Sequence, residues 1–191
     1  MKVGLFFGSF NPIHIGHLII GNYVVEEMPL DQVWYVVSPQ SPFKKKDRLL
    51  NEYDRLRMVE LATQDNYKLQ SSNVEFNMPK PSYTIDTLAH LSDLFPSYQF
   101  TLLMGSDNLK SLPKWKNYEL ILRNYKIVVY KRSGSLDHPL FNDPSVRILD
   151  NTPLLNISST FIRRMIKEGN SIKYIVPEPV EKYIDEMGLY K

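Results

Sequence analysis

Two histidines near the start of the chain, His14 and His17, follow a short turn that contains Gly8 and Ser9. Histidines three residues apart lie on one face of a helix if its first turn includes both, so both rings can point at one oxyanion. Gly8 lets the backbone approach a phosphate closely, and Ser9 can donate from its hydroxyl and its amide. For a single histidine at a helix start, capping is the ordinary alternative. The complete string, with an apolar strand before it, favours a phosphate site.

A second candidate segment lies far downstream, at residues 157–163, with the sequence ISSTFIR. Ser158 or Ser159 can be the N-cap of a helix, whose first amides would then face an anion. Arg163 would lie about one turn into that helix, where its planar guanidinium can bind phosphate oxygens. Plain capping explains such hydroxyl residues when they occur alone. Together with the first turn, they favour phosphate binding.

Apolar and amphipathic segments alternate along the chain, and these elements must position the two segments. We expect strands at residues 2–7, 32–38, 73–77, 99–104, 126–130 and 145–149. We expect helices at residues 15–28, 52–63, 82–94 and 117–122, and a helical last third. This alternation predicts an α/β fold: a Rossmann-like, doubly wound, mostly parallel sheet with helices on both faces. Ligands bind such sheets at the carboxyl ends of the strands, near the point where the strand order reverses, and the first turn is expected there.

Length and composition limit the function classes. A chain of 191 residues, 43% of them hydrophobic, fits one domain over 1–191, with the helical part from about residue 157 belonging to it. There are no cysteines, which excludes disulfides, thiolate zinc sites and thiol nucleophiles. We expect no membrane span and no signal peptide, and therefore a cytoplasmic protein. A net charge of +2 is too balanced for a nucleic-acid or membrane-surface partner.

The tetrad HIGH at residues 14–17, preceded by GSFNP at residues 8–12, resembles the nucleotidyltransferase superfamily, which includes adenylyltransferases and class I aminoacyl-tRNA synthetases. Residues 157–163 are similar to the ISSTxIR element of this group, which opens a helix on the other side of the triphosphate. The resemblance implies that ATP is bound by residues of both segments: Gly8, Ser9, Phe10, Asn11, Gly16, Ser158, Ser159 and Thr160. It assigns catalytic roles to His14, His17 and Arg163.

Further segments resemble bacterial nicotinate mononucleotide adenylyltransferases over nearly the whole chain. Residues 82–88 are similar to the SYTxDTL of that family, Gly105–Asp107 followed by Trp115 to its GxD and W, and residues 176–184 to its VPxxVxxYI. Two places differ: the chain has SPFK at residues 41–44 where the family usually reads PPHK, and FGSFNP at residues 7–12 where it reads GGTFDP. The resemblance implies transfer of AMP from ATP to nicotinate mononucleotide, with release of pyrophosphate, in NAD biosynthesis.

The remaining site residues follow from the resemblance and from their chemistry. Lys44 would be a mobile catalytic counter-charge, or part of a solvated loop. Gly105 and Asp107 would belong to the ATP site, with Asp107 orienting a ribose hydroxyl; an Asx turn or N-cap is the alternative for Asp107. Arg132 resembles the strand-end arginine of the family near adenosine, and is otherwise an exposed loop cation.

The acceptor would be bound by Ser82, Tyr83, Thr84 and Trp115. A flat, electron-poor ring suits an indole face, and a carboxylate suits the amides that open the helix at residues 82–94. A core tryptophan is the alternative for Trp115. Because the attacking phosphate monoester is largely a dianion at neutral pH, it needs no general base, and the histidines are expected to stabilise charge.

Mg²⁺ is the expected cofactor, bridging the phosphates and held largely by water and substrate oxygens, with its protein ligands left open. Three alternatives also stay open. The acceptor can be nicotinamide mononucleotide or another phosphorylated molecule such as phosphopantetheine, or the chain can be a non-catalytic nucleotide-binding module. The oligomeric state is not predicted.

Overall fold

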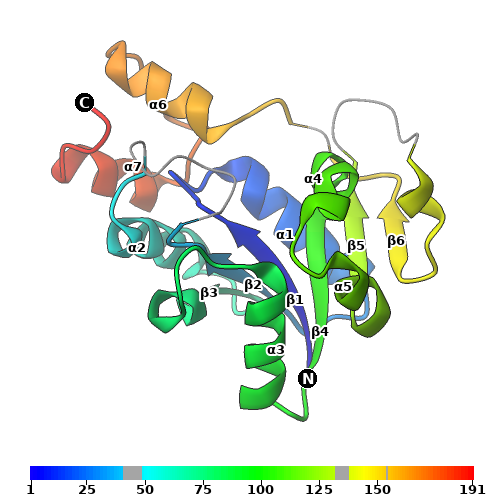
Figure 1. Ribbon diagram of the computed structural model, residues 1–191. Coiled ribbons are helices and arrows are strands. Elements are labelled where there is room, and N and C mark those ends of the chain that lie inside the picture. The colour runs from blue at the N-terminus through cyan, green and yellow to red at the C-terminus, as the bar shows by residue number, and fades with distance from the viewer. Residues whose placement is uncertain (41–48, 132–137, 154) are drawn as a thin grey trace.

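The computed structural model describes residues 1–40, 49–131, 138–153 and 155–191. Its described residues form a six-stranded sheet in the order β3-β2-β1-β4-β5-β6, and every pair of neighbouring strands is parallel. The strands are β1 Lys2–Gly8, β2 Gln32–Val37, β3 Leu69–Ser72, β4 Gln99–Gly105, β5 Lys126–Tyr130 and β6 Val146–Leu149. The order reverses between β1 and β4, so the carboxyl end of β1 is the switch point of a doubly wound sheet (Figure 1).

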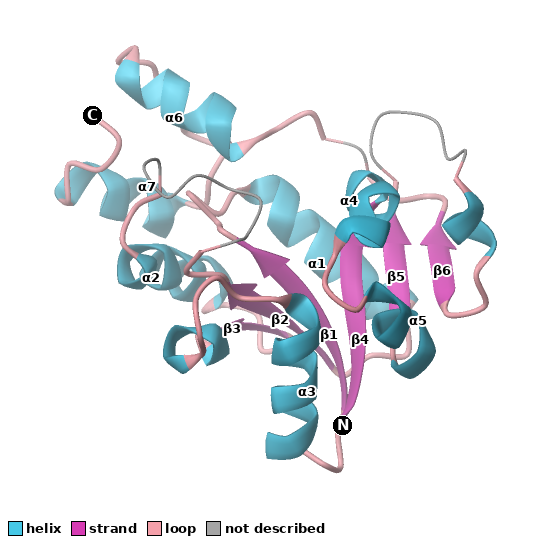
Figure 2. Ribbon diagram, in the orientation of Figure 1, coloured by secondary structure: helices cyan, strands magenta, loops and turns pink. Residues whose placement is uncertain are grey.

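Helices cover both faces of the sheet, as predicted (Figure 2). They are α1 Ile15–Glu27, α2 Glu52–Thr63, α3 Thr84–Leu94, α4 Ser106–Ser111, α5 Tyr118–Asn124, α6 Ser159–Lys167 and α7 Glu178–Glu186. Successive strand residues point to opposite faces, so Phe6 and Tyr35 join one core while Leu5 and Val36 join the other. The parallel, doubly wound fold is therefore the one that the sequence predicts.

The C-terminal helices share a core with the first strand. Ile162 of α6 and Ile184 of α7 are fully buried in the cluster that contains Phe6. Helix α7 also packs against α2. A shared core supports one domain over residues 1–191, which stays a prediction.

The prediction of a strand at residues 73–77 is wrong. The third strand is Leu69–Ser72, which pairs with β2 from Val33 to Val36, and Val74–Asn77 forms a 3₁₀ helix. The apolar alternation at Val74 and Phe76 suggests a strand, but Glu75 between them is buried and accepts a hydrogen bond from Thr87. Strand β3 has only four residues, three of them polar, so no apolar alternation marks it in the sequence.

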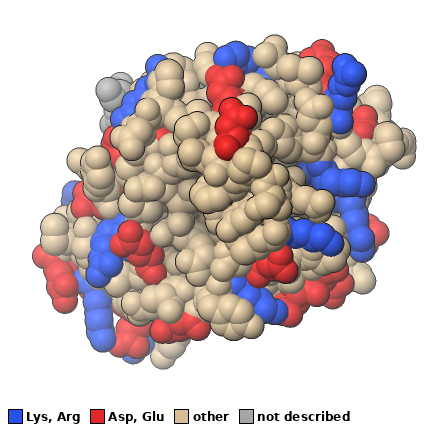
Figure 3. Space-filling view, turned by 90° about the horizontal axis from the view of Figure 1, so that it is seen from below, with Lys and Arg blue, Asp and Glu red and all other residues tan. Residues whose placement is uncertain are grey.

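The helix predicted from residue 82 begins instead at Thr84. Tyr83 is its extended N-cap, and the amide of Ser82 donates to the carbonyl of Gln40 at 3.1 Å, outside any helix. No helix in the described part of the chain is long and apolar enough to cross a membrane. On the face shown in Figure 3, Lys and Arg side chains are interspersed with Asp and Glu, as the balanced charge predicts.

Candidate active site

Two clefts open at the carboxyl edge of the sheet and meet at the turn after β1. The histidine cleft, of about 740 Å³, is lined by residues that include His14, His17, Asp107, Ser158–Thr160 and Arg163. The tryptophan cleft, of about 540 Å³, is lined by residues that include Glu75, Ser82–Thr84, Asn108 and Trp115. Both clefts are lined by Phe7, Gly8, Ser9 and Asn108. The two clefts therefore adjoin at these four residues.

A third cavity, also of about 740 Å³, lies at the opposite edge, where strands begin at Lys2, Gln99 and Lys126. Because two of the three cavities have the same volume, we identify the site by its position. Open parallel sheets bind ligands at the carboxyl ends of their strands, near the switch point. The two predicted segments also lie there, and we take the two adjoining clefts as the candidate active site.

The two histidines lie side by side, as their spacing predicts. Their rings stack with centroids 3.8 Å apart and planes 27° apart. His14 is the N-cap of α1, and its backbone N–H donates to Nδ1 of His17 at 3.3 Å. Because Nδ1 accepts this bond, a neutral His17 carries its proton on Nε2. His17 is thus arranged as a hydrogen-bond donor; that the pair binds phosphate stays a prediction.

Glycine leaves room for a neighbouring ring at two positions of this site. A Cβ on Gly16 would lie 3.0 Å from Nδ1 of His14, so the ring would have to shift slightly to make room for a larger residue. A Cβ on Gly8 would lie 2.7 Å from the ring of Phe10. Both glycines therefore make room for neighbouring rings, an effect beyond the close phosphate approach predicted for Gly8.

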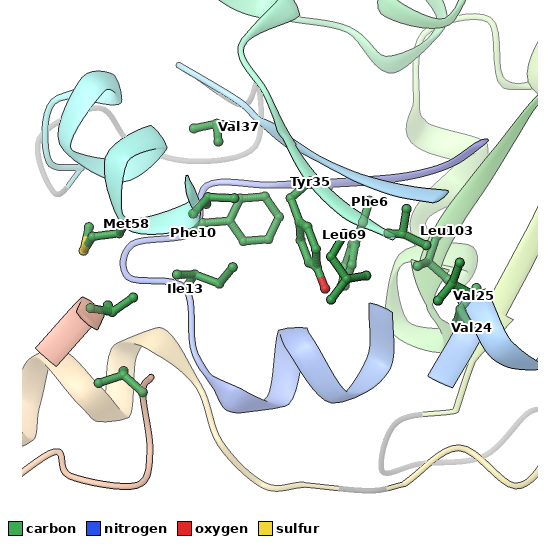
Figure 4. Packing of buried hydrophobic residues seen from close by; sticks show 14 of the residues in the cluster. Phe6, Phe10, Ile13, Val24, Val25, Tyr35, Val37, Met58, Leu69 and Leu103 are labelled. Carbon is green, nitrogen blue, oxygen red and sulfur yellow. The ribbon is translucent and has the colours of Figure 1, made fainter. Parts of the chain in front are cut away.

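Phe10 shapes the turn from inside the core. Its backbone is left-handed, with φ of 43°, a conformation that costs a bulky residue about 1–3 kcal/mol. Its ring is only 2% exposed and packs against Phe6 and Tyr35 (Figure 4). The buried ring holds the strained turn in place, and the phosphate contact predicted for Phe10 is left to its backbone.

The start of α6 is fastened to the same turn. Ser158 is the N-cap, since its Oγ accepts from the amide of Phe161 at 3.2 Å. Arg163 donates from Nη1 to the carbonyl of Asn11 at 2.7 Å, and from Nη2 to the hydroxyl of Thr160 at 3.2 Å. The hydroxyl of Ser159 donates to the carbonyl of Pro12 at 2.8 Å. The structure thus brings together the two segments that the sequence singles out.

The four residues predicted to bind the acceptor all line the tryptophan cleft. Trp115 is half-buried: it packs against the edge of one core cluster and also lines the cleft. Lys116 holds the neighbouring loop to the start of α3: its Nζ lies 2.7 Å from Oδ2 of Asp86 and 4.9 Å from the centroid of the Tyr83 ring. This arrangement leaves an indole beside a helix start, which suits a flat acidic ring.

Four predicted residues remain, and the structure describes two of them, Gly105 and Asp107. Gly105 ends β4 and is the N-cap of α4, so the N-cap alternative for Asp107 is wrong. Asp107 lines the histidine cleft, and its neighbour Asn108, which the sequence did not single out, lines both clefts. Lys44 and Arg132 lie outside the described residues.

Comparisons with known proteins show the family of this chain. The model of the family described as cytidylyltransferase-like matches residues 5–165. The chain belongs to the cytidylyltransferase-like family. It is 54% identical over 193 residues to a probable nicotinate-nucleotide adenylyltransferase of Flavobacterium psychrophilum, with both chains covered completely. It is 50% identical over 195 residues to the protein of the same name from Flavobacterium johnsoniae, again with complete coverage.

The fold matches that of Plasmodium falciparum nicotinic acid mononucleotide adenylyltransferase complexed with NaAD. The TM-score is 0.83 at 19% identity, with 99% of this chain and 97% of the other covered. The predicted resemblance to nucleotidyltransferases is confirmed, and this member of the cytidylyltransferase-like family is an enzyme of that class.

Besides Asn108, the sequence did not single out two residues that support or line this cytidylyltransferase-like site, and the first is Arg55. Its guanidinium is fully buried behind the shared turn and donates to four backbone carbonyls. The acceptors are Ser9 at 2.7 Å, Ser38 at 2.8 Å, Leu50 at 3.0 Å and Pro39 at 3.2 Å. On a charged helix such as α2, nothing in the spacing distinguishes Arg55 from a surface cation.

The second missed residue is Glu75, which is 1% exposed and lines the tryptophan cleft. Its Oε1 accepts from the hydroxyl of Thr87 at 2.8 Å. Burial raises the pKa of Glu75, an effect that nearby hydroxyls offset in part. The tryptophan cleft therefore has a buried carboxyl group whose charged form is less favourable than that of an exposed glutamate.

Among the described residues, no group of three His, Asp or Glu side chains can hold a metal ion. The donors near the histidine cleft are the carboxylate of Asp107 and several hydroxyls. Such a set fits an ion that takes most of its ligands from water and phosphate, as Mg²⁺ does.

Proposed function

We propose that this chain is a nicotinate-nucleotide adenylyltransferase, which transfers AMP from ATP to nicotinate mononucleotide and releases pyrophosphate, in NAD biosynthesis. The observation that carries the proposal is the pair of clefts that meet at Gly8 and Ser9. One cleft presents imidazoles and a guanidinium, which suit a triphosphate, and the other presents an indole and a helix start, which suit a pyridine acid. The names of the Flavobacterium relatives support the same reaction.

The reaction forms a bond between an oxygen of the acceptor phosphate and the α-phosphorus of ATP, and breaks the bond from that phosphorus to pyrophosphate. The attacking phosphate is already largely deprotonated at neutral pH, so it needs no base. The difficulty is to bring two anions together and to stabilise the charge that moves to the α-phosphoryl oxygens and the leaving group. We assign the first task to the shared turn, which lies between the two ligands.

The second task falls to the histidine cleft. His17 donates from Nε2 to an α-phosphoryl oxygen, and His14 stacks beside it. Arg163 and the amides of Ser159 and Thr160 bind the β and γ phosphates, and Lys44 supplies a further counter-charge. Mg²⁺, when bound, would neutralise phosphate charge. The carboxylate of Asp107, which lines the cleft, would bind water ligands of the ion or a ribose hydroxyl.

The acceptor ring stacks on Trp115, and its carboxylate faces the amides at the start of α3, beside Tyr83 and Thr84. Backbone amides donate only, so they favour a carboxylate over an amide group, whose nitrogen is also a donor. We therefore expect the amides at the start of α3 to give a preference for nicotinate over nicotinamide. A cytoplasmic location also remains our prediction from the sequence.

The test supplies ATP and Mg²⁺ with one acceptor at a time and measures pyrophosphate release. We expect turnover with nicotinate mononucleotide and a lower kcat/KM with nicotinamide mononucleotide. Phosphopantetheine serves as the acceptor without a pyridine ring and is expected to give no release. ATP binding without turnover on any acceptor would contradict the proposal and favour a non-catalytic module.

A further inference from the structure

Asn11, in the turn after β1, is bonded to three segments that are far apart in the sequence. Its Oδ1 accepts from the hydroxyl of Tyr190 at 2.9 Å and from the amide of Leu50 at 3.4 Å. Its carbonyl accepts from Arg163 at 2.7 Å. Asn11 itself is only 2% exposed, and all three bonds are partly buried. Its position is therefore determined by residues outside the turn.

Tyr190, the residue before the last, reaches this turn from the C-terminal end, which lies near α6 and α7 (Figure 1). Its backbone is left-handed, with φ of 66°, which is unfavourable for a tyrosine and has to be offset by its contacts. Burial raises the pKa of its hydroxyl, which nearby Arg163 and Arg55 offset in part. The hydroxyl thus keeps its proton and donates to Asn11.

We propose that Tyr190 is a positioning residue for adenylyl transfer: its hydroxyl fixes Asn11, whose carbonyl in turn holds Arg163 at the triphosphate end of the histidine cleft. The inference rests on the proposed role of Arg163. The Tyr190 hydroxyl does not need to touch substrate, because the Asn11 backbone joins it to the guanidinium. The effect on ATP should therefore exceed the effect on the acceptor, whose cleft lies beyond the shared turn.

The chain offers a matched control in Tyr183. Its hydroxyl donates to Oδ1 of Asp54 at 2.8 Å and so joins α7 to α2. Both tyrosines come from the C-terminal region, and both use the hydroxyl to bond a side chain in the first third of the chain. Only Tyr190 bonds the turn that leads to Arg163. Loss of either hydroxyl should change stability similarly, and only one loss should change catalysis.

The experiment compares Tyr190→Phe, Tyr183→Phe and the wild type. We expect each variant to lower Tm by about 2–4 °C, as loss of one hydrogen bond does in a chain of this size. For Tyr190→Phe we expect kcat/KM for ATP to fall about 10-fold, with KM for the acceptor within about twofold, by comparison with the loss of one positioned donor. For Tyr183→Phe we expect both constants within about twofold of wild type. Equal kcat/KM for ATP in the two variants would overturn the proposal.

A second measurement tests the route through Arg163. In an Arg163→Lys background, which keeps the charge but not the planar fork, the effect of Tyr190→Phe on ATP should shrink below about twofold. If the effects of Tyr190→Phe and Arg163→Lys on kcat/KM for ATP simply multiply, Tyr190 does not act through Arg163. Binding of a non-hydrolysable ATP analogue, measured by calorimetry on all variants, requires no acceptor. This binding measurement tests the role of Tyr190 even if the proposed reaction is wrong. The proposed reaction is tested separately, by the turnover assay on the wild type.

Discussion

The histidine cleft and the tryptophan cleft share one turn but are held together by different interactions. Around the histidine cleft, guanidinium groups donate to backbone carbonyls, from Arg163 to Asn11 and from Arg55 to Ser9. Around the tryptophan cleft, Lys116 pairs with a carboxylate and a tyrosine ring, next to a half-buried indole.

This difference follows from the two tasks we propose. Charge moves during phosphoryl transfer, and donors stabilise it best when they are already fixed in position. Bonds from cations to backbone carbonyls fix the turn itself. The pyridine ring does not react, so stacking and an exposed ion pair suffice to hold it. Each variant below is expected to disturb one cleft, the other, or both.

Arg55→Met is expected to have the largest effect, because Arg55 joins the shared turn to the loop after β2. The change removes the donor of four buried or partly buried carbonyls, and we expect a loss of about 4 kcal/mol in the free energy of unfolding, measured by urea denaturation. Arg57→Met is the control on the same helix, since Arg57 is exposed and its guanidinium pairs with Glu60 on the surface at 3.1 Å. It should change stability by less than about 0.5 kcal/mol. Equal losses would contradict the bridging role.

His17→Ala is expected to disturb the histidine cleft alone. We expect kcat to fall about 10²-fold or more, with a smaller change in ATP binding, because the lost donor acts mainly on charge that develops during transfer. His90→Ala, on the exposed side of α3, is the control and should leave kcat within about twofold. An unchanged kcat in His17→Ala would refute the donor role.

The sequence predicts the histidine cleft better than the supports behind it. His14, His17 and Arg163 stand in short motifs whose chemistry can be read locally, and the fold brings those motifs together. Arg55 and Tyr190 are isolated in the sequence, and each bonds a distant residue of the turn: Ser9 is 46 residues from Arg55, and Asn11 is 179 residues from Tyr190. Such roles depend on tertiary contacts that no local pattern encodes.

The errors in secondary structure have the same origin. The buried carboxyl of Glu75 and the amide of Ser82 each find a partner in a distant segment, and these bonds override a strand pattern and a helix start. The central strands, by contrast, contain apolar residues such as Phe6 and Val128 that mark them in the sequence. Long apolar elements were therefore predicted well, and polar edges of the site were not.

Trp115→Ala is expected to disturb the tryptophan cleft alone. Loss of the indole face should lower kcat/KM for nicotinate mononucleotide about 10-fold, since stacking of a ring on an aromatic side chain contributes about 1–3 kcal/mol. KM for ATP should stay within about twofold, and Trp115→Phe should recover most of the loss. Equal effects on both substrates would mean that Trp115 supports the shared turn instead.

Glu75→Gln tests the smallest expected difference, a change in how stability depends on pH. Burial raises the pKa of Glu75 in the folded protein above its ordinary value of 4.5, so the folded state favours the neutral carboxyl. This contribution to stability is complete below the ordinary pKa and is lost as pH rises through the folded pKa. Glutamine keeps an acceptor for Thr87 and has no proton to lose, so its advantage in Tm over wild type should grow as pH rises from about 4 to 8.

Glu52→Gln is the control of opposite sign. The pKa of Glu52 is lowered in the folded protein, mainly by its hydrogen bond to Lys80, so its contribution is present above the ordinary pKa and is lost as pH falls. The Tm of Glu52→Gln relative to wild type should therefore decline as pH rises, while that of Glu75→Gln improves. If the Tm differences of both variants from wild type change in the same direction with pH, burial does not raise the pKa of Glu75. The tryptophan cleft would then differ from the histidine cleft only in its aromatic ring and its ion pair.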